Sequence, residues 1–318
     1  MNLLQRAELL LARVLLTVLR ALPPATASNL GGWVARTVGV WLPQSATANA
    51  NLRAAMPELS AADRARIIRG VWDNLGRTVA ELPHIASLQR DTPSGPGIVF
   101  QGTEIMQHLR ETGGPAVFAS AHIGNWEVLP AACAMFGIAF AGVYRASANP
   151  GIDALTRELR HAATGHDVPM FNKGMDGARG ALAHLAKGGF LGLLVDQKMN
   201  DGIEVKLFGM PAMTAPALAA FALRYRCPVV CGHVERIGPA RFRVVAEPPL
   251  ALAITGDRRA DIAAVTQQVN DVLERWIRAK PESWLWLHRR WPKDVVLVKQ
   301  RKKAGGDEAV PPGPPGYT

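Results

Sequence analysis

The pattern of apolar and polar positions divides the chain near residue 90. Before that point the apolar residues recur with helical spacing, and Pro57 and Pro83 separate the segments. After it, short apolar runs alternate with longer amphipathic stretches. The runs predict strands at 98–101, 115–121, 138–144, 168–171, 190–195, 229–236 and 242–247. The amphipathic stretches predict helices at 103–110, 128–136, 152–163, 174–187, 217–225 and 257–279.

Strands that alternate with helices are typical of an α/β fold with a mostly parallel sheet covered on both faces. The runs at 229–236 and 242–247 form an expected antiparallel pair, so the sheet should be mixed. We therefore predict a helical N-terminal region over 1–90 and an α/β domain over 91–300. A last edge strand is expected at 295–298. The Pro/Gly clusters and charges of 301–318 predict a disordered tail.

The first helical segment, residues 3–22, has the character of a helix that lies on a lipid surface. Its charges exclude a spanning helix, which needs about 20 nearly uncharged residues. Three arginines at intervals of seven occupy one stripe, and Trp33 and Trp41 in the next segment favour a membrane–water boundary. The remaining face carries Leu3, Leu4, Ala7, Leu10, Leu11, Val14 and Val18. Packing of this helix on the protein's own body is the alternative.

Charge and cysteine content limit the classes of partner. The formal net charge is +10, carried mostly by arginine, which predicts anionic partners such as anionic lipid or an acidic protein. The chain has no long basic block with interleaved aromatics, so nucleic acid ranks last. Cys133, Cys227 and Cys231 lie in or beside apolar runs and are expected to be reduced, buried thiols of a cytoplasmic-side protein rather than metal ligands.

The best candidate for chemistry is the turn between the strand at 115–121 and the helix at 128–136. It contains His122 and, five positions later, Glu127. On one continuous helix their side chains would point about 140° apart. They can meet only if His122 precedes the helix, and Gly124 supplies the necessary backbone freedom.

A carboxylate bound to one imidazole nitrogen leaves the other as a general base near neutral pH. We therefore predict that His122, oriented by Glu127, removes a proton from a substrate hydroxyl that attacks an activated acyl group. Asn125 or backbone N–H groups would stabilise the oxyanion. A buried histidine with its hydrogen bonds satisfied is the alternative, because chance pairs of this spacing are common.

Two further polar positions follow predicted strands. Arg145 comes after 138–144, and Asp196 comes after 190–195. Ligands of such sheets collect at the carboxyl ends of strands. Arg145 is expected either to bind a phosphate or a carrier, or to pair with a carboxylate; Asp196 either orients the site or caps its loop. The Trp-rich stretch 284–291 is expected to pack in the core, with His288, Arg289 and Arg290 near the surface.

Several motifs occur together in order. They are His122-Ile-Gly-Asn-Trp-Glu127, Tyr144-Arg145, Asn149-Pro150, Asp196-Gln197, Leu207-Phe208-Gly209, Ala212-Met213-Thr214, Pro228-Val229-Val230 and Trp284-Leu-Trp-Leu-His-Arg-Arg-Trp291. In these motifs the chain resembles the lipid A biosynthesis acyltransferases, the lauroyl and myristoyl late acyltransferases with a His-x4-Asp/Glu motif. The resemblance covers about residues 49–292. It departs from the family pattern at Lys206-Leu207 and at Pro292, which leaves the acceptor and the acyl length open.

The resemblance implies transfer of a fatty acyl chain from acyl carrier protein to a hydroxyl of a phosphorylated glycolipid, at the cytoplasmic face of the inner membrane. It implies His122 as the base and Glu127 as its partner, with Arg145 and Asp196 in the site. It implies no metal and no organic cofactor. Two alternatives remain at this stage: an acyltransferase for another hydroxylated lipid, and a non-catalytic lipid-binding protein of the same fold.

Overall fold

The computed structural model describes residues 1–292 and 296. The predicted tail at 301–318 and, apart from Val296, the predicted edge strand at 295–298 lie outside these described residues. The N-terminal region is helical, as predicted. It consists of α1 (Leu3–Arg20), α2 (Pro24–Val38), η1 (Gly39–Trp41), α3 (Gln44–Ala55), α4 (Ala61–Glu81) and η2 (Leu82–Ser87). Ser60 caps α4, because its hydroxyl accepts the N–H of Asp63 at 3.1 Å.

The α/β part begins at residue 97. Its strands are β1 (Gly97–Gln101), β2 (Ala116–Ser120), β3 (Phe140–Tyr144), β4 (Met170–Asn172), β5 (Phe190–Leu194), β6 (Ile203–Leu207), β7 (Met210–Thr214), β8 (Val229–Gly238) and β9 (Arg241–Ala246). Its helices are α5 (Thr103–Thr112), α6 (Val128–Met135), α7 (Pro150–Thr164), α8 (Met175–Ala186), α9 (Ala217–Tyr225), α10 (Arg258–Ala279) and the short η3 (Pro281–Ser283). The helices and strands predicted between residues 98 and 279 are all present, and their ends agree within two residues.

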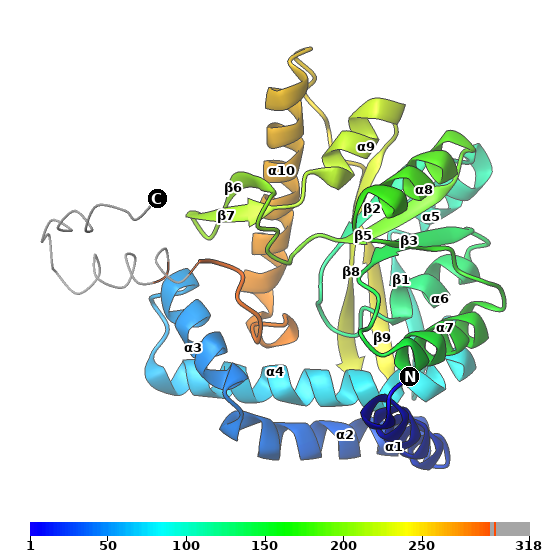
Figure 1. The fold of residues 1–318 in the computed structure, drawn as a ribbon, viewed down its shortest axis with the longest axis vertical. Coiled ribbons are helices and arrows are strands. Elements are labelled where there is room, and N and C mark those ends of the chain that lie inside the picture. Colours follow the sequence, from blue (N-terminus) through cyan, green and yellow to red (C-terminus); the bar gives the residue numbers. More distant parts are fainter. Residues whose placement is uncertain (293–295, 297–318) are drawn as a thin grey trace, which may run out of the picture.

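The main sheet has seven strands in the order β1-β9-β8-β2-β5-β3-β4 (Figure 1). β8 and β9 are antiparallel, as expected, and the other neighbours are parallel. The predicted fold, a mostly parallel mixed sheet flanked by helices, is thus confirmed. One prediction was wrong: residues 196–216, expected to be a loop, contain the β6–β7 hairpin. Apolar and polar residues alternate there, which is a strand signal.

Both faces of the sheet are buried, because alternate residues of each strand enter opposite hydrophobic clusters. Val117, Leu191 and Val229 lie with α8, α9 and α10, whereas Ala116, Phe190 and Val230 lie with α5 and α6. The first cluster continues into α3 and α4 through Leu52, Ile67 and Trp72. The N-terminal helices therefore share one core with the sheet. Figure 1 shows α4 running across one end of it, with α2 alongside.

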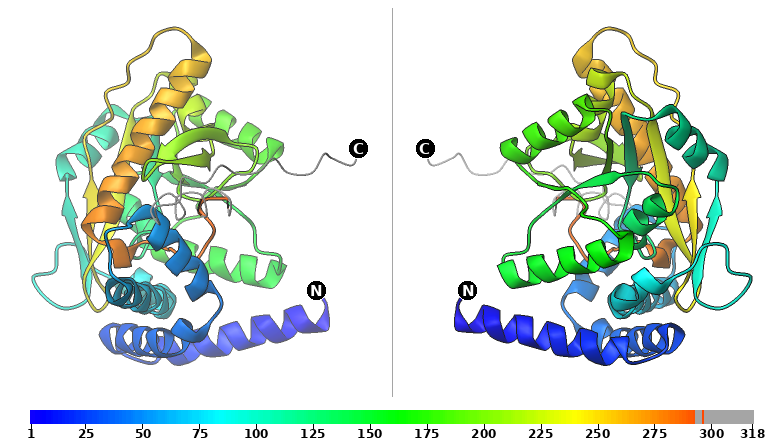
Figure 2. Two further views of the ribbon diagram at one scale, coloured as in Figure 1. Left: turned by 90° about the vertical axis from the view of Figure 1, so that its left-hand side faces the viewer. Right: turned by 90° about the vertical axis from the view of Figure 1, so that its right-hand side faces the viewer.

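α1 extends from the body beside α7, as the two views of Figure 2 show. One side of α1 faces the protein: Asn149 donates to Gln5 O at 2.9 Å and to Glu8 Oε2 at 2.9 Å, and Leu19 is buried. The predicted apolar face is exposed instead, with Leu11 70% accessible. Exposed apolar side chains continue along α2 and η1 at Leu30, Trp33, Val34, Val38 and Trp41. Within residues 1–292, none of the helices is both long and apolar enough to cross a bilayer.

Candidate active site

The candidate site lies where β2 and β5 end side by side. The two strands are parallel, with Ser120 paired to Leu194, and the N–H of Val195 donates to Ser120 O at 2.9 Å. His122 lies two residues after Ser120, and Asp196 lies two residues after Leu194. His122 and Asp196, 74 positions apart in sequence, therefore meet at one edge of the sheet.

Asp196 holds His122 by both main chain and side chain. Nδ1 of His122 lies 2.8 Å from Oδ1 of Asp196, and the backbone N–H of His122 donates to Oδ2 at 3.0 Å. The indole N–H of Trp284 also donates to Oδ2, at 2.8 Å. Asp196 is completely buried. Burial raises the pKa of this carboxyl, but His122, His288 and Trp284 more than compensate and hold the pKa far below its usual range.

The same contacts decide the protonation of the imidazole. Burial lowers the pKa of His122, but the charge and hydrogen bond of Asp196 outweigh it, so the pKa lies above its ordinary value. Because the carboxylate can only accept, Nδ1 carries the hydrogen. Nε2 is then the nitrogen that can take up a proton, and the ring lines a cavity beside Trp126. This is the arrangement of a general base.

Glu127 lies close to His122 but is bound to another group. His122 precedes the helix, as the spacing required, and Glu127 is the N-cap residue of α6. Its carboxylate accepts two hydrogen bonds from Arg160 of α7, at 3.1 and 3.0 Å. The hydrogen bond expected between Glu127 and the imidazole is thus made by Asp196 instead. The charge of Glu127 still contributes to raising the pKa of His122.

Asn125 has a different place from the one predicted. It is completely buried, its amide N–H₂ donates to Glu81 Oε2 at 2.9 Å, and its amide oxygen accepts the N–H of Glu127 at 3.2 Å. Both ends of the side chain are therefore engaged within the protein, and the cavity is lined by Trp126 and Glu127 rather than by Asn125. In this structure the side chain predicted to stabilise an oxyanion points to Glu81 and does not reach the cavity.

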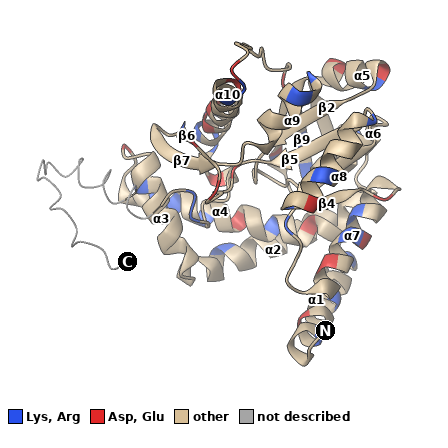
Figure 3. Cartoon of the chain, turned by 45° about the horizontal axis from the view of Figure 1, so that its top comes forward, with Lys and Arg blue, Asp and Glu red and all other residues tan. Residues whose placement is uncertain are grey.

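The cavity has a charged mouth. Its volume is about 490 Å³, within the range usual for small-molecule sites. Arg145 after β3 and Lys173 after β4 are both exposed and line it, together with Arg160 and Gln197. Basic residues also occur on α1, α7 and α8, so the excess positive charge is spread over several elements (Figure 3). The mouth therefore suits a ligand with phosphate or carboxylate groups.

The interior of the cavity is apolar. It runs between the sheet and α6, and its lining includes Met106, Phe118, Leu129, Cys133, Phe140, Val230 and Val244. Its floor includes Gly142 and Gly192, which pair across β3 and β5. A Cβ on Gly192 would come within 2.1 Å of the Phe140 ring, so the absence of a side chain there makes room for that ring. Burial raises the pKa of the Cys133 thiol to about 12, which leaves it protonated and unsuited as a nucleophile.

Sequence reasoning missed two parts of the site. Arg160 carries no local signal, because it is one of two arginines on an amphipathic helix. Trp284 was assigned to the core; it is buried, but its indole also binds Asp196. The predicted surface position of Arg290 was wrong: this guanidinium is completely buried and donates to Met213 O at 3.0 Å and to Thr214 at 2.6 Å.

Comparison with known proteins assigns the chain to a family. The family model described as bacterial lipid A biosynthesis acyltransferase matches residues 1–293. The chain belongs to this family. A search of curated proteins finds no match. The resemblance inferred from the ordered motifs is confirmed, and the family assignment makes the protein an acyltransferase of lipid A biosynthesis.

Proposed function

We propose that this protein moves a fatty acyl chain from acyl carrier protein to a hydroxyl of a phosphorylated glycolipid, a lipid A precursor. The reaction takes place at the cytoplasmic face of the inner membrane, with His122 as the general base. One observation carries the proposal: the His122–Asp196 pair lies where a cationic mouth opens into an apolar cavity. The two halves of the cavity match a charged headgroup and a hydrocarbon chain.

The transfer needs a base and an activated acyl group. Nε2 of His122 takes the proton of the acceptor hydroxyl, and the oxygen attacks the thioester carbonyl. The tetrahedral intermediate then expels the carrier's thiolate, which recovers the proton from the imidazolium. Asp196 stabilises that imidazolium and keeps Nδ1 protonated throughout. General acid–base catalysis of this kind contributes about 10²–10⁴ in rate.

The remaining residues bind or orient. The apolar cavity receives the acyl chain, while Arg145 and Lys173 bind anionic groups at the mouth. Glu127 supports the base by its charge, and its two hydrogen bonds with Arg160 fix the side of the cavity that α7 forms. No metal or organic cofactor enters this scheme.

The exposed face of α1 supports binding to a membrane. Its leucines and valines are not needed for packing, because the opposite side of the helix makes the contacts with α7. Insertion into a lipid surface would remove this apolar area from water, and Arg6, Arg13 and Arg20 would reach lipid phosphates from the flank. The acceptor lipid would then be within the same interface as the enzyme.

The test is a transfer assay with defined substrates. Purified protein on anionic vesicles receives acyl carrier protein loaded with chains of different length, together with phosphorylated glycolipids and other hydroxylated lipids as acceptors. Mass spectrometry should detect acylated glycolipid, and His122→Ala should abolish it. Transfer only to another class of lipid would show that the acceptor is that lipid and not a phosphorylated glycolipid. No transfer to any acceptor, or equal transfer by His122→Ala, would overturn the proposal.

A further inference from the structure

Glu81 is a buried carboxylate at the C-terminal end of α4, outside the cavity lining. It is completely buried, which for an ionised group costs several kcal/mol unless it is well paired. It accepts hydrogen bonds from the guanidinium of Arg236, from Ser28 Oγ at 2.6 Å, from Asn125 at 2.9 Å and from the N–H of Ala240 at 3.2 Å. Four separate segments of the chain therefore meet at this one side chain.

One of these segments is the turn that carries the base. Asn125 donates its amide N–H₂ to Glu81 and accepts the N–H of Glu127 with its amide oxygen. Glu81 can only accept, and a backbone N–H can only donate. The amide of Asn125 thus has a single orientation that satisfies both neighbours. Through Asn125, Glu81 fixes the main chain of Glu127, which lines the cavity with His122.

Other residues on the same face of α4 hold the preceding part of the turn. The carbonyl of Gly124 accepts from Asn74 Nδ2 at 2.9 Å and from Thr78 Oγ1 at 3.2 Å, and its N–H donates to Ser283 O at 3.0 Å. Positions 74, 78 and 81 are spaced to lie on one helix face. α4 therefore clamps the turn at Gly124 and, through Glu81, at Asn125.

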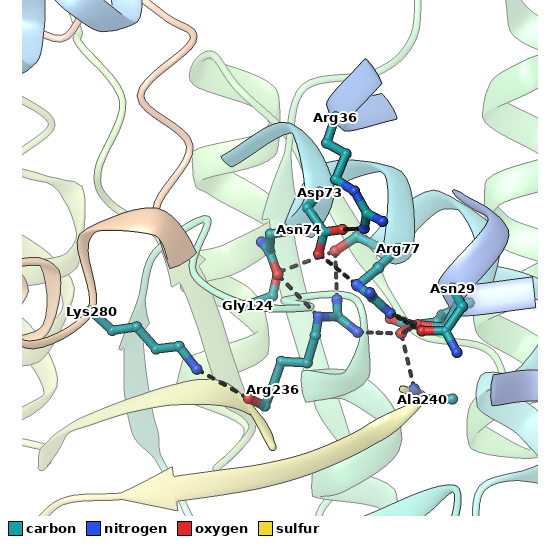
Figure 4. A network of polar contacts seen from close by, with 12 residues as sticks. Asn29, Arg36, Asp73, Asn74, Arg77, Gly124, Arg236, Ala240 and Lys280 are labelled. Carbon is teal, nitrogen blue, oxygen red and sulfur yellow. Dashed lines mark hydrogen bonds and ion pairs between the residues drawn. The ribbon is translucent and has the colours of Figure 1, made fainter. Parts of the chain in front are cut away.

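Arg236 of β8 binds all three of these α4 residues, Asn74, Thr78 and Glu81. Its guanidinium binds Glu81 and also donates to Asn74 Oδ1 at 3.2 Å and to Thr78 Oγ1 at 3.3 Å. Figure 4 shows Arg236 reaching between Asn74 and the part of the network that includes Ala240. The network is charge-assisted and buried, conditions in which hydrogen bonds are strong and geometrically demanding.

We propose that Glu81 is a positioning residue for the acyl transfer, acting through Asn125 on the turn that contains His122 and Glu127. This inference rests on the proposed function, since Glu81 would hold the acyl-transfer site in its active geometry although it does not line the cavity. Misplacement of a catalytic group by about 1 Å can cost about 10²-fold in rate. Loss of Glu81 should therefore lower kcat rather than weaken substrate binding.

Glu81→Gln is the first variant, because it preserves shape and creates a mismatch. If the new amide N–H₂ faces Asn125, two donors oppose each other unless Asn125 turns over, and then its N–H₂ opposes the N–H of Glu127. If the amide is reversed, it faces the N–H of Ala240 and the guanidinium of Arg236. We expect kcat to fall about 10- to 100-fold, with KM for both substrates close to that of the wild type.

The double variant Glu81→Gln/Asn125→Asp restores complementarity. The amide at 81 donates to the carboxylate at 125 and accepts from Ser28, Ala240 and Arg236, while that carboxylate accepts the N–H of Glu127. The buried negative charge is also retained. We expect the double variant to recover most of the lost kcat, whereas Asn125→Asp alone sets two carboxylates face to face and should be less active than the double variant.

Asp63→Asn is the control on the same helix, since it neutralises a carboxylate of α4 that binds Arg66 about five turns from Glu81. It should retain the wild-type kcat. Hydrogen–deuterium exchange of residues 121–128 provides a second measurement that needs no activity: exchange should accelerate in Glu81→Gln and slow again in the double variant. If the wild type transfers no acyl chain, the proposed function fails, and exchange alone decides the role of Glu81.

Two results would overturn the inference while the proposed function stands. One is a Glu81→Gln variant with wild-type kcat and unchanged exchange of the turn. The other is a double variant that is no more active, and no better protected, than Glu81→Gln, with both proteins folded by circular dichroism.

Discussion

A single carboxylate, that of Asp196, holds His122 by both its ring and its backbone, with contacts of 2.8 Å to Nδ1 and 3.0 Å to the main-chain nitrogen. A base held in this way has its tautomer and its direction fixed together. The contact also unites two loops that follow neighbouring parallel strands, so the strand pairing itself assembles the site.

Replacing Asp196 by Asn should change both the rate and its pH dependence. The carboxylate raises the pKa of His122 against the effect of burial, so without it the pKa falls. The base must be neutral to act, and the acid limb of the kcat profile should therefore move to lower pH. The plateau should fall by about 10²–10⁴, because Asn cannot stabilise the imidazolium. Rates of transfer measured from pH 5 to 9 test this. An acid limb at the wild-type pH would contradict it.

Glu127→Gln should have a smaller effect of the same sign. Glu127 raises the pKa of His122 by charge alone, without a hydrogen bond to the ring, so its loss should shift the acid limb to lower pH by less than Asp196→Asn does. The rate should also decrease, because the partly buried guanidinium of Arg160 loses its charged partner and is held less firmly. The same pH series measures both variants. A shift equal to or larger than that of Asp196→Asn would show that Glu127 is the principal partner.

Gly192→Ala should shorten the acyl chains that the cavity accepts. The new methyl group would meet the Phe140 ring at 2.1 Å and push it into the cavity. Gly142→Ala is the milder comparison in the same floor, because its Cβ would meet the flexible end of Met170 at 2.9 Å and the Phe140 ring only at 3.5 Å. With carrier protein loaded with chains of graded length, Gly192→Ala should lose long-chain transfer selectively. Equal loss at every length would instead indicate a general packing defect, which typically costs about 1–3 kcal/mol.

Leu11→Glu should weaken membrane binding without destabilising the protein. Leu11 is exposed on the apolar face of α1, and burial of a leucine in lipid contributes about 1.5–3 kcal/mol, so partition into anionic vesicles should drop by about tenfold or more. Ile254→Glu, at an exposed site before α10, is the control. Vesicle sedimentation measures partition, and thermal unfolding should be nearly unchanged for both variants. Identical binding by wild type and Leu11→Glu would refute a role for this face.

Much of the fold could be read from local patterns. Strands buried on both faces appear as continuous apolar runs, whereas helices buried on one face show apolar residues at every third or fourth position. These two patterns predicted the alternation of strands and helices. Between residues 98 and 279 the β6–β7 hairpin was missed; it turns at Phe208 and Gly209, both with positive φ. Each of its strands has only five residues. An alternation of apolar and polar residues over so short a segment is a weak signal, and the whole segment from Asp196 to the next helix was assigned as a loop.

The candidate site was predictable in part. Sequence spacing required His122 to precede the helix of Glu127, and it does. The identity of its partner was not determined by spacing, because two carboxylates, Glu127 nearby and Asp196 far along the chain, satisfied the same chemical requirement. Arg290 was misplaced for a related reason: an arginine among tryptophans looks like a surface cation until its acceptors, Met213 O and Thr214, are in place.

The sequence by itself determined the fold class, the family, the position of His122 before the helix of Glu127 and the apolar face of the first helix, since each depends on residues that are close in the chain or on ordered motifs. The tertiary structure alone decided that Asp196 orients His122, that Glu127 binds Arg160, and that Asn125 points to Glu81. These contacts join residues between 33 and 74 positions apart. They follow from the order and register of the strands and from the packing of α4 and α7, which local periodicity does not encode.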